Sequence, residues 1–297
     1  MRILLNGKKA ILDPVRSGIF AARESLGKNI EVRPTWEAGD IQRLVKEAIN
    51  EGVERIVAGG GDGTVNEVVN ALAQFKPKQQ PSVAILPLGT ANDFATSCQI
   101  PTDVEQALIS AANNRAHPVD LVKVNDMHFI NVASAGFGAH VTATTPTELK
   151  NFLGGKAYTL AGLVKALNLK PYKGKAKYDN GELEGEMLIG AICNGRQAGG
   201  GQPLAPNATI NDGLMDVIVV QAFPLTDAPK VLQELLGESN SDTYVKRFQC
   251  SWLEYEGDDV MPLNLDGEPH DNQKLSFKVI PKAIDLVLPE DSPVISQ

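Results

Sequence analysis

Short apolar runs alternate with helical patterns over the N-terminal part of the chain. The runs at residues 3–5, 30–32, 55–58 and 82–86 have the length and composition of buried strands. Between them, apolar positions recur at spacings of three and four, which predicts helices over residues 17–27, 39–51 and 64–75, and a further helix pattern follows at 104–112. This alternation is typical of a parallel sheet with helices on both faces, so we expect an α/β domain.

From His128 onward the pattern changes to strands separated by turns. Turn signals such as Asp212-Gly213 and Asp266-Gly267 divide this part of the chain. Strands are expected at residues 128–134, 186–192, 214–221, 247–256, 274–280 and 283–288. The pattern predicts a second, mostly antiparallel β domain, and the turn-like pair Asn125-Asp126 places the boundary near residue 124.

Composition narrows the class of protein. The net charge of −8 argues against general nucleic-acid binding, because affinity for phosphate backbones needs an excess of Lys and Arg. Cys98, Cys193 and Cys250 are widely spaced without a C-x-x-C pair, which indicates reduced thiols and a cytoplasmic protein. We expect neither a signal peptide nor a transmembrane helix, because no apolar run has the required length and flanks.

The sharpest motif is a glycine-rich turn between a strand and a helix, G-G-G-D-G-T-V-N-E at residues 59–67. Glycines allow positive φ angles and the close approach of a ligand, and a helix N-terminus carries partial positive charge. The turn therefore predicts a phosphate-binding site. It matches neither the Walker A motif, since no Lys follows the glycines, nor G-x-G-x-x-G, since residue 64 is Thr. A loop without lysine needs positive charge from elsewhere.

A second turn of the same kind follows one β-α unit later, P-L-G-T-A-N-D-F-A at residues 87–95. Both turns follow strands of the expected parallel sheet, at the edge where such sheets bind ligands, so the two Gly-Thr corners should face one crevice. The alternative is that both are ordinary capping boxes, whose spacing Thr64 and Glu67 have. Three consecutive glycines favour the functional interpretation, because they cost conformational entropy unless something must approach closely.

These two turns resemble the signature pair of the diacylglycerol kinase catalytic domain family. Further motifs agree with this resemblance in the same order along the chain: H-P-V-D-L at 117–121, N-V-A-S-A-G-F-G at 131–138, N-D-G-L-M-D at 211–216 and D-G-E at 266–268. Within that family the chain is similar to the YegS-like group of bacterial lipid kinases, including T-W-E at residues 35–37 and N-G-R-Q-A-G-G-G at 194–201.

The resemblance implies an N-terminal α/β domain like that of NAD kinase and phosphofructokinase, followed by an antiparallel β-sandwich. The domains would span residues 1–124 and 125–284, with a tail at 285–297 that returns to the first domain, and ATP and lipid would bind in the cleft between them. Many relatives have Asn-Pro where this chain has Asn6-Gly7, so we leave this pair out of the expected site.

The resemblance also assigns residues to the nucleotide and to Mg²⁺. Asp62, Asp93 and Asp120 would gather Mg²⁺, directly or through water, and so replace the missing lysine. Thr35 and Thr90 would make further contacts with the nucleotide. The phosphate loop itself would comprise Gly60, Gly61, Asp62, Gly63, Thr64, Val65, Asn66 and Glu67.

Glu268 would be the general base on the lipid hydroxyl. A structural divalent site, for Mg²⁺ or Ca²⁺, would use the Asp212 carboxylate and the carbonyls of Thr209 and Leu214. Each assignment has a plainer alternative, since an acid after Asp-Gly is commonly a solvated turn residue, Asp212 lies in an ordinary hairpin turn, and Asp120 could simply end a strand. The glycines at 199–201 form either a wall of the cleft or a long turn.

The expected function is an ATP- and Mg²⁺-dependent transferase that phosphorylates a hydroxyl of a glycerolipid. Phosphatidylglycerol is favoured over diacylglycerol, although no residue pattern decides between them. An NAD kinase shares G-G-D-G-T but would have a T-P-T-G-S-T-A-Y type of segment, where this chain has G-T-A-N-D-F. A catalytically silent nucleotide- or lipid-binding module is the other alternative. The presence together of the acids Asp62, Asp93, Asp120 and Glu268 argues against it.

The segment Lys156–Lys177 contains six lysines and no acid. Helix-like spacing over residues 158–167 would allow a basic, half-apolar face to rest on anionic head groups. A solvated helix that covers the β domain is the alternative and is favoured here. We therefore expect a cytoplasmic protein, with peripheral contact at the inner face of the membrane as the further hypothesis.

Overall fold

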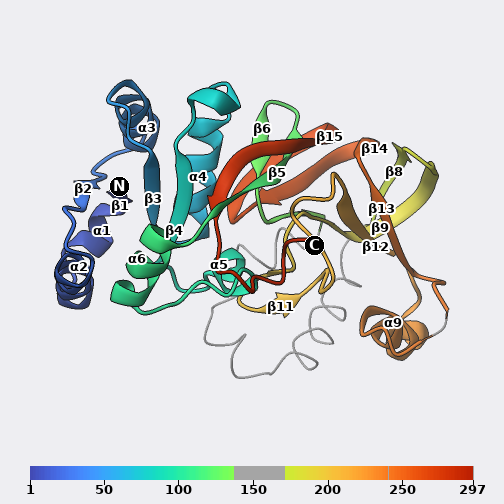
Figure 1. Ribbon diagram of the computed structural model, residues 1–297. Coiled ribbons are helices and arrows are strands. Elements are labelled where there is room, and N and C mark those ends of the chain that lie inside the picture. Colours follow the sequence, from blue (N-terminus) through green and yellow to red (C-terminus); the bar gives the residue numbers. More distant parts are fainter. Residues whose placement is uncertain (137–170, 240, 297) are drawn as a thin grey trace.

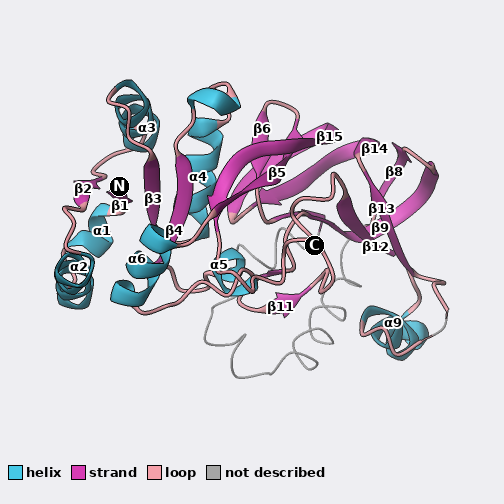
Figure 2. Ribbon diagram, in the orientation of Figure 1, coloured by secondary structure: helices cyan, strands magenta, loops and turns pink. Residues whose placement is uncertain are grey.

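A parallel sheet with helices on both faces forms the N-terminal part of the molecule (Figures 1 and 2). The computed structural model describes residues 1–136, 171–239 and 241–296, with the side chains of Glu268, Pro269 and Asp271 outside this description. The sheet order is β4-β3-β1-β2, and all of these strands are parallel. The strands are β1 (Arg2–Leu5), β2 (Glu31–Pro34), β3 (Arg55–Gly60) and β4 (Ser82–Pro87).

The helices bury the apolar stripes that the sequence pattern predicted. On one face α3 and α4 pack together, and Leu44 and Val68 belong to a single core with Ile56 of the sheet. On the other face α2 and α6 pack together over Ile19 and Leu108. The helices are α1 (Gly7–Ala10), α2 (Asp13–Leu26), α3 (Asp40–Asn50), α4 (Asp62–Leu72), α5 (Asp93–Ser97) and α6 (Val104–Asn113), with a 3-10 turn at Pro77–Gln79.

Helix α4 begins earlier than its capping-box spacing predicts. Gly61 is the N-cap residue and no side chain caps the helix, so Thr64 lies inside the first turn. The prediction of a capping box that begins at Thr64 is therefore wrong. Thr64 instead lies against the preceding strand, because a Cβ placed on Gly60 would come within 2.2 Å of the Thr64 hydroxyl.

Antiparallel strands continue the parallel sheet into a β domain. A shared apolar core includes Phe129, Val217 and Phe277, so the alternating pattern after residue 128 has the predicted outcome. The strands are β5 (Ala116–Val124), β6 (Met127–Phe129), β7 (Val132–Gly136), β8 (Tyr172–Tyr178), β9 (Gly181–Cys193), β10 (Gln197–Ala198), β11 (Gln202–Pro203), β12 (Met215–Gln221), β13 (Val245–Cys250), β14 (Trp252–Leu265) and β15 (Glu268–Val287), with a 3-10 turn at Leu225–Asp227 leading into α9 (Ala228–Leu235). The α/β fold with an added antiparallel β domain is confirmed.

Several strand boundaries differ from the sequence pattern, and residues 128–134, predicted as one strand, divide between β6 and β7. Residues 247–256 are not one strand, because the Asp179 carboxylate accepts the N–H groups of Ser251 and Trp252 and separates β13 from β14. Conversely, β15 is one long strand that absorbs two predicted ones, and its register on β5 shifts between Ile280 and Ile284. A register shift lets a strand bend while its pairing continues.

Strand β15 joins the two parts of the molecule. It pairs with β14 and β5 in antiparallel fashion, and near its end Leu286 pairs with Val83 of β4 in parallel (Figure 1). Beyond it, the Ser292 hydroxyl donates to the Cys98 carbonyl, so the final residues lie on the N-terminal part. The division into domains at residue 124 stays a prediction.

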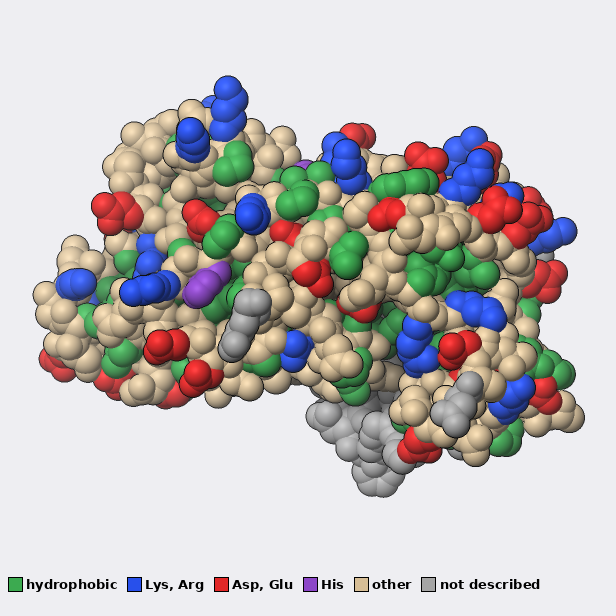
Figure 3. All heavy atoms as spheres, turned by 45° about the vertical axis from the view of Figure 1, so that its right-hand side comes forward, with side chains coloured by type: hydrophobic (Ala, Val, Ile, Leu, Met, Phe, Trp, Pro, Cys, Tyr) green, Lys and Arg blue, Asp and Glu red, His purple; other side chains and the backbone are tan. Residues whose placement is uncertain are grey.

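The basic segment is only partly described. Its expected helix at 158–167 lies outside the described residues. Lys173, Lys175 and Lys177 lie on β8, directly opposite glutamates on β9, and Lys175 forms ion pairs with Glu182 and Glu184. Acidic and basic side chains are likewise interspersed on the face shown in Figure 3. Among the described helices, none is long and apolar enough to span a membrane.

Candidate functional site: two cavities at the first turn of α4

The two glycine turns pack directly against each other. A Cβ on Gly89 would lie 2.6 Å from the Gly61 Cα, and a Cβ on Gly61 would lie 3.1 Å from the Gly89 Cα. The Leu88 N–H also donates to the Gly60 carbonyl at 2.8 Å. The structure thus brings both Gly-Thr corners together, as expected. None of residues 59–63 has positive φ, however, so these glycines are needed for close packing of the loops and not for a left-handed turn.

Asp62 links the first turn of α4 to the first turn of α5. Its carboxylate accepts the N–H groups of Asp93 at 3.2 Å and Phe94 at 3.1 Å. The N-terminus of α5 therefore provides donors to a carboxylate from the other loop. Burial raises the pKa of Asp62, and the neighbouring Asp93 charge adds to this rise.

Asp93 in turn holds the glycine loop between β10 and β11. Its two carboxylate oxygens accept the N–H groups of Gly200 at 2.9 Å and Gly201 at 2.6 Å. Gly199, Gly200 and Gly201 all have positive φ, which only glycine adopts readily. The loop is therefore a fixed wall beside Asp93 in this structure.

Asp266, at the turn between β14 and β15, accepts a cluster of N–H groups. The backbone N–H groups of residues 130, 131 and 132 reach its carboxylate at 2.8–3.1 Å, and the Asn66 amide donates to it at 2.8 Å. Burial raises the pKa of Asp266 to about 6, and the charge of Asp62 contributes to this rise. Asn66 thus ties α4 to the β14–β15 turn.

A cavity of about 280 Å³ lies among these groups, and we call it the acidic cavity. Three carboxylates line it, from Asp62, Asp93 and Asp266, together with Gly63 and Gly200. No Lys or Arg among the described residues lines this cavity. Buried carboxylates without a cation are unfavourable unless N–H groups or a metal ion compensate their charge.

A second cavity, of about 540 Å³, lies on the other side of the α4 turn. Thr64 and Glu67 of α4 line it opposite Thr35 and Trp36, and we call it the Trp36 cavity. Asn6, Gly7, Lys8, Ile11, Glu37, Ala38 and Ile41 complete it. Of the residues predicted for the nucleotide, Thr35, Thr64 and Glu67 therefore share one cavity.

Asp120 lies apart from the acidic cavity. Its carboxylate accepts the N–H groups of Gly213 at 2.7 Å and Lys282 at 2.8 Å, which ties β5 to the turn at 211–214 and to the bend of β15. In that turn, Asp212 accepts the Thr209 hydroxyl and the Leu214 N–H. The three residues predicted for a structural divalent site thus share one turn.

The remaining predicted residues are placed as follows. Thr90 is exposed, directly after Gly89. Val65 is buried in α4. Glu268 begins β15 with its backbone opposite Leu265, next to Gly267 of the acidic cavity. Within the described parts of the chain, no three His, Cys, Asp or Glu side chains form a group that could hold a metal ion by themselves.

The sequence interpretation missed two contributions to the site. Asp266 was treated only as a turn residue, yet it is one of the three acids of the cavity; the D-G-E motif was the available signal. Asn6 and Gly7 were left out, yet both line the Trp36 cavity. A Cβ on Gly7 would come within 2.1 Å of the Thr35 carbonyl oxygen. The absence of a side chain at Gly7 therefore permits a close contact with Thr35.

Sequence profiles of known families match both parts of the chain. The "Diacylglycerol kinase catalytic domain" matches residues 5–124, and the "YegS C-terminal NAD kinase beta sandwich-like domain" matches residues 131–288. Together with the paired glycine turns, these matches define a kinase with a catalytic domain of the diacylglycerol kinase type.

Relatives extend the similarity over the whole chain. A protein of Shewanella frigidimarina named "Probable lipid kinase YegS-like" is 50% identical over 299 residues, which cover 100% of this chain and 96% of its own. A protein of the same name from Chromohalobacter salexigens is 43% identical and covers 99% of this chain and 94% of its own. The chain therefore belongs to the YegS-like lipid kinase family.

Solved structures from Bacillus anthracis str. Sterne have the same fold. One superposes with a TM-score of 0.80 at 24% sequence identity, covering 98% of this chain and 95% of its own. Another, titled as a diacylglycerol kinase, has a TM-score of 0.71 at 20% identity and covers 98% and 97%.

Proposed function

We propose that this lipid kinase transfers the γ-phosphate of ATP to a hydroxyl of a glycerolipid and depends on Mg²⁺. The observation that carries the proposal is the position of the first turn of α4 between two cavities. Thr64 and Glu67 line the Trp36 cavity, whereas Asp62 and Gly63 line the acidic cavity. A nucleotide laid across this turn would have its base in the first cavity and its terminal phosphate in the second.

The α4 terminus offers phosphate-binding groups without a lysine. The first N–H groups of a helix have no acceptor within the helix, and the aligned peptide dipoles add partial positive charge. Gly60, Gly61 and Gly63 bring no side chain between this backbone and a phosphate. Thr35 lines the cavity on the nucleoside side, and Thr90 lies in the second glycine turn, directly after Gly89.

The acidic cavity fits Mg²⁺ by the chemistry of its donors. Mg²⁺ prefers one or two carboxylates together with phosphate oxygens and water, so it does not need a complete cage of side chains. Asp62 would hold the ion, with Asp93 acting through water, because each carboxylate oxygen that accepts one N–H keeps a second lone pair. When bound, the ion neutralises charge on the transferred phosphoryl group. Asp120, which lies elsewhere, would act by fixing β5.

Glu268 would be the general base. Its backbone starts β15 two residues after Asp266, whose carboxylate fixes this turn through backbone N–H groups. Glu268 would take the proton of the lipid hydroxyl while the hydroxyl oxygen attacks the γ-phosphorus, and ADP would leave. Phosphatidylglycerol is the favoured acceptor, with diacylglycerol as the alternative, at the inner face of the cytoplasmic membrane.

Transfer of labelled phosphate from ATP to a panel of purified bacterial lipids tests this function. The wild-type protein should label a glycerolipid only with Mg²⁺ present. Glu268→Gln should lose at least a hundredfold in labelling while it keeps its affinity for ATP, because only proton transfer is removed. Labelling of NAD in place of any lipid would contradict the proposal, and so would normal turnover by Glu268→Gln.

A further inference from the structure

Trp36 is the most exposed large apolar side chain that the structure describes. Its exposed fraction is 94%, whereas that of the chain's other tryptophan, Trp252 on β14, is 37%. Ile11, at 76%, lines the same cavity. Exposed apolar area of this size, gathered at one cavity, is more typical of a binding site than of scattered surface residues.

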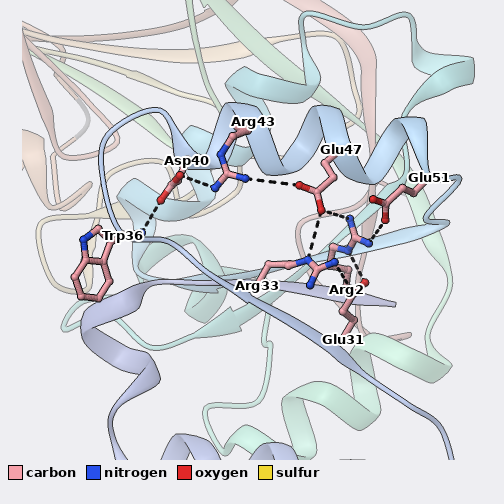
Figure 4. Close-up of polar contacts among 8 residues, drawn as sticks. All are labelled: Arg2, Glu31, Arg33, Trp36, Asp40, Arg43, Glu47 and Glu51. Atoms are coloured by element: carbon pink, nitrogen blue, oxygen red, sulfur yellow. Dashed lines mark hydrogen bonds and ion pairs between the residues drawn. The ribbon is translucent and has the colours of Figure 1, made fainter.

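The backbone that carries Trp36 is held in place. The Asp40 carboxylate accepts the N–H groups of Trp36 at 2.6 Å and of Glu37 at 3.0 Å. Arg43 donates to the same carboxylate at 2.7 Å (Figure 4). On the other side of the loop, the Thr35 N–H donates to the Leu5 carbonyl at 2.9 Å. The loop is therefore fixed at both ends.

The indole ring takes no part in this network. In Figure 4 it points away from Asp40 and from the ion pairs that join α3 to β1 and β2. Arg43 continues that network through Glu47, which also lies near Arg33. A rigid backbone that presents a free aromatic ring offers a stacking surface with little entropy left to lose on binding.

We propose that Trp36 is the nucleobase platform of this kinase, on which the base of the bound nucleotide stacks. The inference rests on the proposed function, since it assumes that a nucleotide lies across the α4 turn. Base stacking on aromatic rings tolerates different bases, so Trp36 contributes affinity for a nucleoside triphosphate and little choice between adenine and guanine. Asp40 is the positioning residue, because its carboxylate accepts the Trp36 and Glu37 N–H groups and so fixes the backbone that carries the indole ring.

Calorimetric titration with Mg²⁺ and a non-hydrolysable ATP analogue tests the platform. Trp36→Ala should weaken binding of the analogue about tenfold, Trp36→Phe should keep most of it, and Trp252→Ala is the matched control that should bind as wild type. Inorganic tripolyphosphate, which has no base, should bind wild type and Trp36→Ala equally. A purely structural role for Trp36 would weaken both ligands.

Fluorescence supplies a second readout because the chain has two tryptophans. In Trp252→Phe, Trp36 is the sole tryptophan, and addition of the analogue should quench its emission. Unchanged emission together with unchanged affinity of Trp36→Ala would overturn the platform and leave the proposed function standing. If the wild-type protein binds neither the analogue nor tripolyphosphate, the proposed function fails, and the platform fails with it.

Discussion

The two cavities on either side of the α4 turn are built in different ways. The acidic cavity is made of carboxylates that each fasten a loop from elsewhere in the chain: Asp62 holds the start of α5, Asp93 the β10–β11 loop and Asp266 the start of β7. The Trp36 cavity is made of segments of the parallel-sheet part alone. Changes at the acidic cavity should therefore disturb stability as well as chemistry, whereas changes at Trp36 should affect binding alone.

The largest effect is expected at Asp266. In Asp266→Asn an amide NH₂ replaces one of the two acceptor oxygens. One oxygen accepts from Ile130 and Asn66 and the other from Asn131 and Val132, so in either orientation the NH₂ faces N–H donors. An unmet buried donor costs about 1–3 kcal/mol, so unfolding in urea at pH 7 should show a loss of about 3 kcal/mol. Asp126→Asn, in an exposed turn, is the matched control and should be neutral. Equal stability of both variants would show that the cluster does not hold the turn.

A smaller effect should follow from pH. Burial raises the pKa of Asp266 to about 6 from an ordinary value near 3.8, so the folded chain binds this proton more tightly than the unfolded chain. This tighter proton binding stabilises the folded chain fully at pH values below the ordinary pKa near 3.8, and the stabilisation is lost as pH rises through about 6. The advantage of wild type over Asp266→Asn in free energy of unfolding should shrink by roughly 2–3 kcal/mol between pH 4 and pH 7. An advantage that grows with pH over this range would contradict the burial of this carboxyl.

The smallest stability change is expected at Asp93. Asp93→Asn removes one of two charge-assisted hydrogen bonds to the Gly200 and Gly201 N–H groups, worth about 1.5 kcal/mol. Hydrogen exchange at those two amides should accelerate. The control is Asp103→Asn, because Asp103 caps α6 through the Gln106 N–H and Asn caps equally well. If exchange at residues 200 and 201 is the same in both variants, Asp93 does not hold the loop.

Sequence patterns predicted strands β1, β3 and β4 and the helices α2, α3, α4 and α6 because burial enforces their periodicity, whereas α9, β5 and β8 were not among the elements that these patterns predicted. The apolar stripe of α3 and the apolar runs of β3 and β4 all face apolar cores. The two glycine turns were also predictable, since both follow parallel strands. The physical reason for their glycines differs from the predicted one. Gly61 and Gly89 lack side chains because the two turns pack closely against each other, and neither residue has a left-handed backbone.

The partners of the acids could not be predicted in the same way. Asp93 and Gly200 are far apart in the chain, and no local pattern shows that one accepts the N–H of the other. The partners of Asp266 could not be predicted either, since its N–H donors come from residues 130–132, which are far away in the sequence. Asp-Gly is an ordinary turn signal, and its use as a buried anchor depends on how β14 pairs with β15 on one side and with β7 on the other.

In the proposed complex, one nucleotide spans both cavities, with its phosphates beside Asp62. The most direct test is calorimetry of the ATP analogue and of tripolyphosphate, with and without Mg²⁺, on wild type and Asp62→Asn. We expect Mg²⁺ to strengthen binding of both ligands to wild type at least tenfold and to have little effect on Asp62→Asn, since Asp62 would hold the ion. If Mg²⁺ strengthens binding to Asp62→Asn as much as to wild type, the phosphates do not lie beside Asp62, and no nucleotide spans both cavities in the proposed way.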